Sequence, residues 1–344
     1  MAKSGIEGDL QARNVLSSIN GVAPLIMEVS AGLTGRWTGG HSSLDSMCSH
    51  ALVPSGKMFR PILVLESALA VGGDARVVLP AAMGAESGHV ASLVHDDIID
   101  DDEIRRGKPS VQHQFGVDNA IVAGDALIFD LFLSLAECRK TGAADSRIVA
   151  AFDVVARRGI ELCRGQIMEA EICERMDFDR EAYLTMAGLK TASLFKGACE
   201  CGALLGGGDD AMVEALSRYA ENLGIAFQIH DDLLSYTRET GVMGKPDTSD
   251  VRNGRLTLPV ILAYELGDSM DRLAITDGLS GEGDPTANRQ ALITILERTG
   301  ALAGTERLAA HYSRQAVDAL AGLPVTLSRE RLARFAEEAI DRDR

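Results

Sequence analysis

The chain of 344 residues has few aromatic side chains and few positive charges. Aromatic residues make up only 4% of it, and it contains a single tryptophan. Because strands favour aromatic and β-branched side chains, this scarcity argues against a β-sandwich and favours a helical core. Acidic residues outnumber basic ones and give a net charge of −16. Such an excess would repel a polyanion, so nucleic acid is not expected as a partner.

The cysteines and the apolar runs also lack the patterns of zinc sites and membrane spans. The six cysteines form no C-x-x-C pair, and we expect them to be reduced, buried thiols. The longest apolar runs, such as 61–72, are short and interrupted by Glu66, so no transmembrane segment is expected. The chain opens on polar, acidic sequence without the pattern of a signal peptide. These features predict a cytoplasmic protein.

Helical periodicity recurs along most of the chain, whereas the alternation typical of strands does not. Clusters of proline and glycine punctuate the periodic segments, and no linker divides the chain. We therefore predict a single all-α domain over residues 1–344, with a variable N-terminal helical region over 1–40. The helices are expected at 8–33, 60–72, 77–100, 118–139, 145–174, 180–205, 209–237, 254–267, 286–321 and 327–341.

Two acidic clusters each end an apolar segment, Asp96-Asp97-Ile98-Ile99-Asp100 and Asp231-Asp232-Leu233-Leu234-Ser235. Carboxylates four residues apart share one face of a helix, so Asp96 and Asp100 converge on one point. Charge of one sign at the inner end of an apolar segment is costly unless a cation neutralises it. No set of cysteines and histidines surrounds either cluster. Hard oxygen ligands of this kind indicate Mg²⁺, usually together with a phosphate.

Basic side chains accompany the acidic clusters along the chain. Arg105 and Arg106 follow the first cluster, and guanidinium groups bind diphosphate through paired hydrogen bonds. Lys57 and Arg60 stand where a helix is expected to begin, a position that favours anions. His89 lies seven residues before the first cluster, on the same helix face, which indicates contact with a phosphate. Each could alone be ordinary surface or core, but together they predict a site for diphosphate.

In the order and spacing of five motifs the chain resembles the trans-isoprenyl (polyprenyl) diphosphate synthases. The motifs lie between about residues 50 and 265: Gly-Lys-x-x-Arg-Pro, Glu86-x-x-His89 leading into Asp-Asp-x-x-Asp, Arg-Arg-Gly, Lys190-Thr191, and Phe-Gln-x-x-Asp-Asp followed by Gly-Lys-Pro. The resemblance implies an all-α bundle of the isoprenoid synthase type around a central cavity, usually as a homodimer. It also implies Mg²⁺-dependent, head-to-tail (1′-4) condensation of isopentenyl diphosphate with an allylic diphosphate, to give a linear trans-polyprenyl diphosphate.

The resemblance also assigns roles to residues. Three Mg²⁺ ions would be bound by Asp96, Asp100 and Asp231. Isopentenyl diphosphate would be held by Lys57, Arg60, His89 and Arg106. The allylic diphosphate would be held by Arg105, Lys190, Thr191, Gln228 and Lys245. The catalytic set would comprise Asp96, Asp97, Asp100, Asp231, Asp232, Lys190 and Lys245. Metal ions and basic groups would neutralise the charge on the leaving diphosphate in a water-poor site.

The second acidic cluster departs from the family pattern, because Ser235 stands where the family has aspartate. Asp231, Ser235 and Glu239 also fit the metal triad of class I terpene cyclases, which gives an alternative function. A cyclase needs no isopentenyl site and often lines its cavity with aromatic side chains, so the retained basic motifs favour the synthase. A non-catalytic subunit of a heteromeric synthase and a binding module without turnover are further alternatives. Arg255 stands where the family commonly has lysine.

Small residues precede the first acidic cluster on the side that would face the growing chain. They are Ala91 and Ser92, with Gly88 above them, and short-chain members of the family often place an aromatic floor at the Ala91 or Ser92 position. Its absence, and the lack of a two-residue insertion in the first motif, predict a product longer than farnesyl, such as geranylgeranyl or longer. Phe129 and Phe132 on the next expected helix are candidates for a deeper floor.

Overall fold

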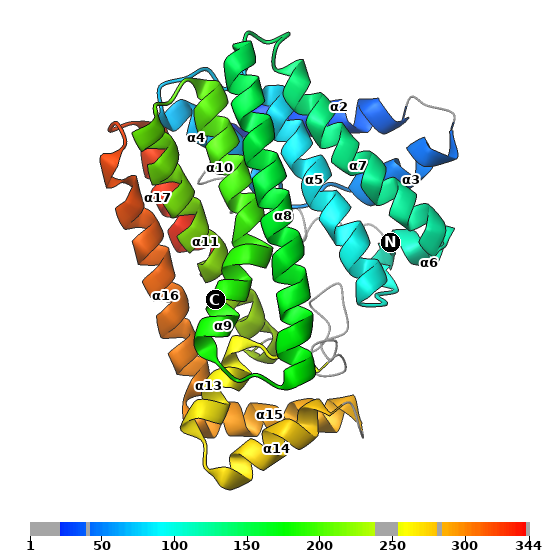
Figure 1. Cartoon of the computed structure of the whole chain (residues 1–344), viewed down its shortest axis with the longest axis vertical. Coiled ribbons are helices and arrows are strands. Elements are labelled where there is room, and N and C mark those ends of the chain that lie inside the picture. Colours follow the sequence, from blue (N-terminus) through cyan, green and yellow to red (C-terminus); the bar gives the residue numbers. More distant parts are fainter. Residues whose placement is uncertain (1–20, 39–41, 238–253, 281–283, 342–344) are drawn as a thin grey trace, which may run out of the picture.

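The structure is a computed structural model that describes residues 21–38, 42–237, 254–280 and 284–341, almost entirely as helices (Figure 1). The all-α prediction is confirmed. The α-helices are α2 (Ala23–Thr38), α3 (Ser43–Leu52), α4 (Phe59–Ala70), α5 (Leu79–Ile99), α6 (Val111–Phe115), α7 (Val117–Glu137), α8 (Asp145–Arg175), α9 (Arg180–Ala187), α10 (Ser193–Gly206), α11 (Asp210–Thr237), α13 (Leu258–Leu266), α14 (Ser269–Leu279), α15 (Pro285–Thr299), α16 (Ala301–Ala319) and α17 (Leu327–Glu338).

Three short elements complete the described chain. A π-helix, η1 (Gly188–Ala192), joins α9 to α10, and a 3₁₀ turn, η2 (Leu320–Gly322), follows α16. A small antiparallel hairpin, β1 (Ile104–Arg105) and β2 (Lys108–Pro109), comes after α5. The hairpin was not predicted, and it matters because it carries both arginines of the Arg-Arg-Gly step.

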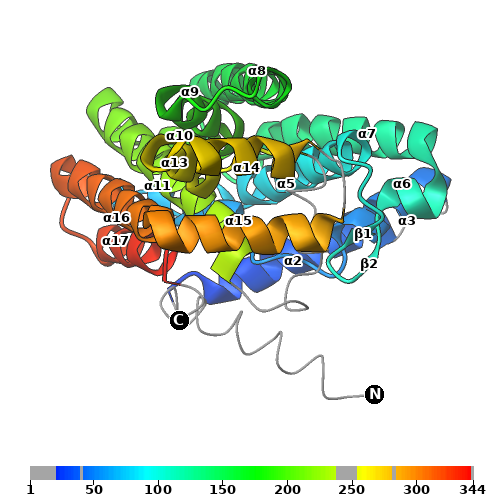
Figure 2. The ribbon, with the colours of Figure 1, turned by 90° about the horizontal axis from the view of Figure 1, so that it is seen from below.

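The long helices lie side by side, and α10 occupies the middle of the bundle (Figure 1). It packs against α4, α8 and α11, while α5 packs along α7 and α11 along α16. Helices α14 and α15 lie across the lower end, where Figure 2 shows them together with α13. Helix α7 is the single described helix apolar and long enough to span a membrane, but its extensive packing on α5 makes it part of the bundle.

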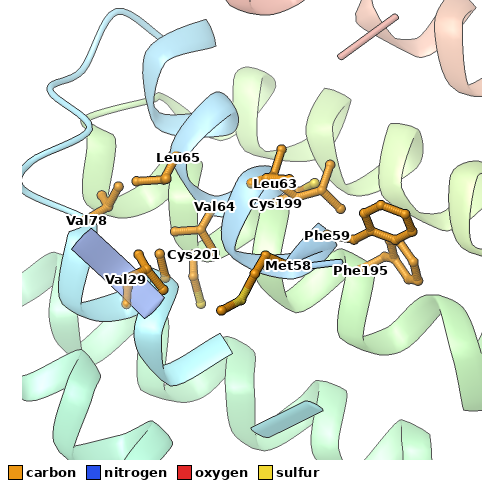
Figure 3. Packing of buried hydrophobic residues seen from close by; sticks show 14 of the residues in the cluster. Val29, Met58, Phe59, Leu63, Val64, Leu65, Val78, Phe195, Cys199 and Cys201 are labelled. Carbon is orange, nitrogen blue, oxygen red and sulfur yellow. The ribbon is translucent and has the colours of Figure 1, made fainter. Parts of the chain in front are cut away.

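The core consists of two groups of buried apolar side chains. The larger group is formed by side chains of α2, α3, α4, α5, α7, α10, the first half of α11 and α17. The smaller group is formed around the second half of α11, η1, α13 and α15. Figure 3 shows α4 and α10 meeting through Leu63, Val64, Cys199 and Cys201. All six cysteines are free; four are buried as expected, but Cys163 is exposed and Cys173 half-buried.

Several helix boundaries differ from the predictions. The helix expected over 286–321 is two helices, because Gly300 adopts φ 74° and ends α15. The helix expected over 254–267 begins only at Leu258, with Pro259 in its first turn. Helix α2 begins at Ala23, and the first part of the expected 8–33 helix lies outside the described residues. Helices α3, α6 and α14 were not predicted.

Candidate active site

The two acidic clusters lie at the C-terminal ends of α5 and α11. Asp96 and Asp100 of the first cluster and Asp231 of the second are half-buried. The middle carboxylates differ: Asp97 is 2% exposed and Asp232 is 7% exposed. The half-buried aspartates are the three that the resemblance assigns to metal. The two buried ones, Asp97 and Asp232, accept hydrogen bonds from Arg105 and Tyr183.

The π-helix η1 connects the two clusters. Lys190 Nζ donates a hydrogen bond to Glu169 Oε2 at 2.5 Å, and its charge also acts on Asp96. The next residue, Thr191, donates from Oγ1 to Gln228 Oε1 at 2.6 Å, and Gln228 lies one turn before Asp231. One short segment therefore has Glu169 and Asp96 near Lys190, and Gln228, close to the second cluster, against Thr191.

Two glycines allow the neighbouring helices to approach η1 closely. A Cβ on Gly165 of α8 would lie 2.3 Å from the backbone nitrogen of Lys190. A Cβ on Gly224 of α11 would lie 2.5 Å from Ala192 Cα. Since π turns widen a helix and are frequent at functional sites, these contacts hold an otherwise unusual backbone between α8 and α11. The position of Lys190 thus depends on two residues that carry no functional group.

Asp96 lies near two other carboxylates, Asp100 and Glu169, and near the basic side chains of Lys190 and Arg255. Burial raises the pKa of Asp96; Lys190 and Arg255 oppose the rise, and Asp100 and Glu169 add to it. Arg255 Nη2 lies 2.5 Å from Asp100 Oδ2, so this arginine forms an ion pair with that carboxylate. An additional cation would relieve this repulsion.

The donor set fits Mg²⁺, because every candidate ligand is a carboxylate oxygen. The described residues contain no group of three acidic, histidine or cysteine side chains close enough to hold a metal ion by themselves. A bound Mg²⁺ would therefore take part of its oxygen ligands from outside the protein, as it usually does when it binds a diphosphate.

A second group of basic side chains is buried beside α5. Arg60 stacks its guanidinium over the Phe195 ring at 4.7 Å, and its Nε has no partner among the described residues. Burial lowers the pKa of Arg60 to about 10, against the opposing charges of Glu86 and Asp231. Arg106 Nη2 lies 3.9 Å from Glu86 Oε1. Two guanidinium groups thus share one buried carboxylate and keep donors for an anion.

His89 and Lys57 belong to the same basic group. The Nδ1 atom of His89 is buried without a hydrogen-bond partner among the described residues. Burial, and then the charges of Arg60, Arg106 and Arg105, lower the pKa of His89 well below its ordinary value, so the imidazole is neutral. Lys57 follows Gly56, whose missing side chain leaves room for the Arg106 guanidinium, since a Cβ there would lie 2.5 Å from Nη2. Arg60, His89 and Arg106 of the predicted set therefore act on one another through their charges, whereas the Lys57 ammonium lies over the Phe59 ring, 5.9 Å from its centroid.

Arg105 lies differently from the role that the resemblance gave it. Its Nε donates to Asp97 Oδ1 at 2.8 Å, its Nη2 contacts the same oxygen, and Asp102 lies 3.5 Å away. The hairpin turn that separates the two arginines uses left-handed backbone at Arg106 and Gly107. In this structure Arg105 holds the middle aspartate of the first cluster, while Arg106 points to the basic group.

The residues expected to set product length are only partly on the expected side of α5. Gly88 faces α7, because a Cβ there would lie 2.9 Å from Leu131 Cδ2. Ala91 is buried and Ser92 half-buried. Phe129 is 72% exposed on the outer side of α7, so its interpretation as a floor is wrong for this chain. Phe132 instead lies against Phe152 of α8, with ring centroids 6.0 Å apart.

Some contacts of the site were missed or lie outside the described residues. Glu86 and Glu169 are acidic residues on otherwise apolar helices, a pattern that indicates a buried functional group. Neither residue was assigned a role from the sequence. Tyr183, which contacts Asp232, carries no sequence signal of its own. Lys245 and Glu239 lie outside the residues that the structure describes.

This fold and this site define an enzyme of the isoprenoid synthase class, and comparison with known proteins agrees. The model of the family described as Polyprenyl synthetase matches residues 41–295, so the chain belongs to the polyprenyl synthetase family. The enzyme is a polyprenyl diphosphate synthase, a prenyltransferase of isoprenoid biosynthesis. Membership of a family of prenyltransferases gives no support to a binding module without turnover or to a cyclase.

Relatives and solved structures match nearly the whole chain. A short chain isoprenyl diphosphate synthase from Methanothermobacter thermautotrophicus is 38% identical over 295 residues, covering 86% of this chain and 89% of the relative. A geranylgeranyl diphosphate synthase from Methanosarcina mazei is 36% identical, covering 84% and 86%. The crystal structure of a polyprenyl synthase from Caulobacter crescentus, complexed with calcium and isoprenyl diphosphate, superposes with a TM-score of 0.86 at 28% identity, covering 95% and 97%. The family is one of enzymes that use divalent metal.

Proposed function

We propose that the enzyme condenses isopentenyl diphosphate with an allylic diphosphate, 1′-4 and head to tail, and releases a linear trans-polyprenyl diphosphate of geranylgeranyl length or longer. The observation that carries the proposal is the π-helix η1, where the charge of Lys190 acts on Asp96 of the first cluster and Thr191 donates to Gln228, one turn before Asp231 of the second. A diphosphate between α5 and α11 would meet basic side chains on one side and metal-binding carboxylates on the other.

In the proposed reaction each group of residues has one task. Asp96, Asp100 and Asp231 would hold three Mg²⁺ ions, which would neutralise charge on the departing diphosphate. The C–O bond of the allylic substrate breaks and its electron pair leaves with diphosphate, held by Lys190 and neighbouring residues. The π bond of isopentenyl diphosphate forms the new C–C bond, and a proton is lost to the diphosphate. The basic group with Arg60 would fix the second substrate in the required orientation.

The proposed product length rests on α5. We propose that the growing chain follows a cavity past Ala91 and Ser92, neither of which is large enough to block it. Phe132 and Phe152 are the proposed limit further along, because their rings already lie together between α7 and α8. The Methanosarcina relative, named a geranylgeranyl diphosphate synthase, supports a product of this size.

We further propose a homodimer in the cytoplasm. Several apolar side chains of α7 and α8 are exposed, and exposed apolar side chains that gather on one face favour an interface between copies of a chain. They are Val117, Ile121, Val122, Ile128, Phe129 and Leu133 on α7, and Val149, Ile160 and Ile167 on α8. Light scattering should give twice the chain mass, and Phe129→Glu should lower it. The free thiols support a reducing compartment.

Incubation with isopentenyl diphosphate, geranyl or farnesyl diphosphate and Mg²⁺, followed by product chromatography, tests the reaction. Linear products that disappear with a chelator are expected. Asp96→Asn and Asp231→Asn should each abolish turnover, whereas Glu28→Gln, in an exposed pair with Arg76, should not change it. Cyclic hydrocarbons, or turnover that survives loss of both site aspartates, would contradict the proposal.

A further inference from the structure

The carboxylate of Asp232 is fully engaged by protein donors. Tyr183 Oη donates to Oδ2 at 2.6 Å, and the backbone nitrogen of Leu258 donates to the same oxygen at 3.0 Å. Gln228 Nε2 donates to Oδ1 at 2.8 Å. These donors come from α9, from the first turn of α13 and from α11 itself. A buried carboxylate with this many short contacts is poorly available to a metal ion.

Tyr183 is suited to be a permanent donor to this carboxylate. Its side chain is 1% exposed. Burial, and then the charge of Asp232, raise the pKa of Tyr183 well above its ordinary value, so the hydroxyl keeps its proton. A hydrogen bond between a hydroxyl and a carboxylate is among the stronger ones in proteins. The pair therefore fixes α9 to α11 at the level of the second acidic cluster.

Through Gln228, Asp232 is connected to Thr191, which is proposed to bind the allylic diphosphate. Because Gln228 Nε2 faces Asp232, its Oε1 faces the other way and accepts from Thr191 Oγ1 at 2.6 Å. The carboxylate thus sets which end of the Gln228 amide meets η1. Asp231 precedes Asp232 on the helix, so anchoring Asp232 fixes the rotation of this helix turn and with it the direction of the Cα–Cβ bond of Asp231.

We propose that Tyr183 and Asp232 are positioning residues, a buried pair that aims Asp231 and Gln228 at the metal-bound allylic diphosphate. The inference rests on the proposed function of the site. It separates Asp232 from the metal ligands and gives Tyr183 a role in the reaction without contact with substrate.

Tyr183→Phe tests the pair, and the chain offers a matched control in Tyr219→Phe. Tyr219 is also fully buried, and its Oη donates to the Leu332 carbonyl at 2.8 Å, toward α17. Both variants should lose similar thermal stability. Only Tyr183→Phe should raise the KM for the allylic diphosphate and the Mg²⁺ concentration at half-maximal rate, each by about tenfold, while leaving the KM for isopentenyl diphosphate unchanged. Equal kinetic effects of the two variants would overturn the proposal.

A binding measurement keeps the test independent of turnover. Mg²⁺ with inorganic diphosphate should raise the Tm of the wild type and of Tyr219→Phe, and should raise it clearly less in Tyr183→Phe and Asp232→Asn. In Asp232→Asn the new amide would face Gln228 Nε2 donor to donor and turn the Gln228 side chain. Full protection in Asp232→Asn would refute the role of this carboxylate. Absence of prenyl products from the wild type, with these shifts retained, would refute the proposed reaction instead.

Discussion

Gly165 on α8 should be essential to the geometry of the site, although it bears no side chain. An alanine Cβ there would lie 2.3 Å from Lys190 N, whereas ordinary contact begins at 3.4 Å. Helix α8 and η1 would therefore have to separate by about 1 Å. The atoms that the new Cβ would meet are backbone atoms of Leu189 and Lys190, so no side-chain rotation relieves the contact. Lys190 and Thr191 would move with the segment.

The expected losses for Gly165→Ala follow from that displacement. A misplacement of about 1 Å costs about 100-fold in kcat/KM, or about 2.7 kcal/mol of transition-state stabilisation. Overpacking should also destabilise the fold by about 1–3 kcal/mol. Steady-state kinetics and thermal melts measure both.

Gly188→Ala is the matched control, because it lies in η1 itself. Its backbone is ordinary right-handed helix, with φ −61°, and the nearest atom to a new Cβ is Ile225 Cδ1 at 3.9 Å. This variant should keep wild-type kinetics and gain up to about 1 kcal/mol of stability. If Gly165→Ala were as active as Gly188→Ala, the close approach of α8 would not position Lys190.

Three other variants test neighbouring parts of the site. Because Glu86 faces Arg106 and Arg60, Glu86→Gln should raise the KM for isopentenyl diphosphate several-fold and leave the KM for the allylic substrate unchanged. Equal changes in the two KM values would contradict this prediction. Ala91→Phe should shorten the product in chromatography, and an unchanged product spectrum would remove the argument. Folding lowers the pKa of His89 well below its ordinary value of 6.5. Below about pH 6.5 the unfolded chain therefore binds a proton at His89 that the folded chain does not bind. The free energy of unfolding should fall as the pH drops through this range, by up to about 1.4 kcal/mol per pH unit. His89→Gln should flatten this part of the denaturation profile, and an unaltered slope would refute the assignment.

The helices that carry the acidic clusters could be predicted closely, because their apolar periodicity ends at the clusters. Helix α5 ends at Ile99 and α11 spans Asp210–Thr237, within two residues of expectation at each end. Helices α3 and α14 were missed although each begins with a capping box, Ser42 with Asp45 and Asp268 with Asp271. That local signal was available and is stronger than periodicity for short helices.

The break at Gly300 could not be found in the same way. Apolar periodicity continues on both sides of it, and a glycine within a helical pattern is tolerated at a modest cost. What ends α15 is the left-handed conformation of this residue, which two helices packed at an angle require. Tertiary packing decides such a boundary, so the local pattern of residues 286–321 indicated one helix where the chain forms two.

The division of labour within each Asp-Asp doublet is also a tertiary property. Adjacent residues on a helix point about 100° apart, so only one member of a doublet can face a given site. Which member does so depends on partners far away in the sequence: Arg105 on the hairpin holds Asp97, and Tyr183 on α9 holds Asp232. The motif identifies four aspartates as equivalent acids, whereas packing makes two of them anchors. Asp97→Asn and Asp232→Asn should therefore weaken the binding of Mg²⁺ only indirectly, through the lost contacts with Arg105 and Tyr183.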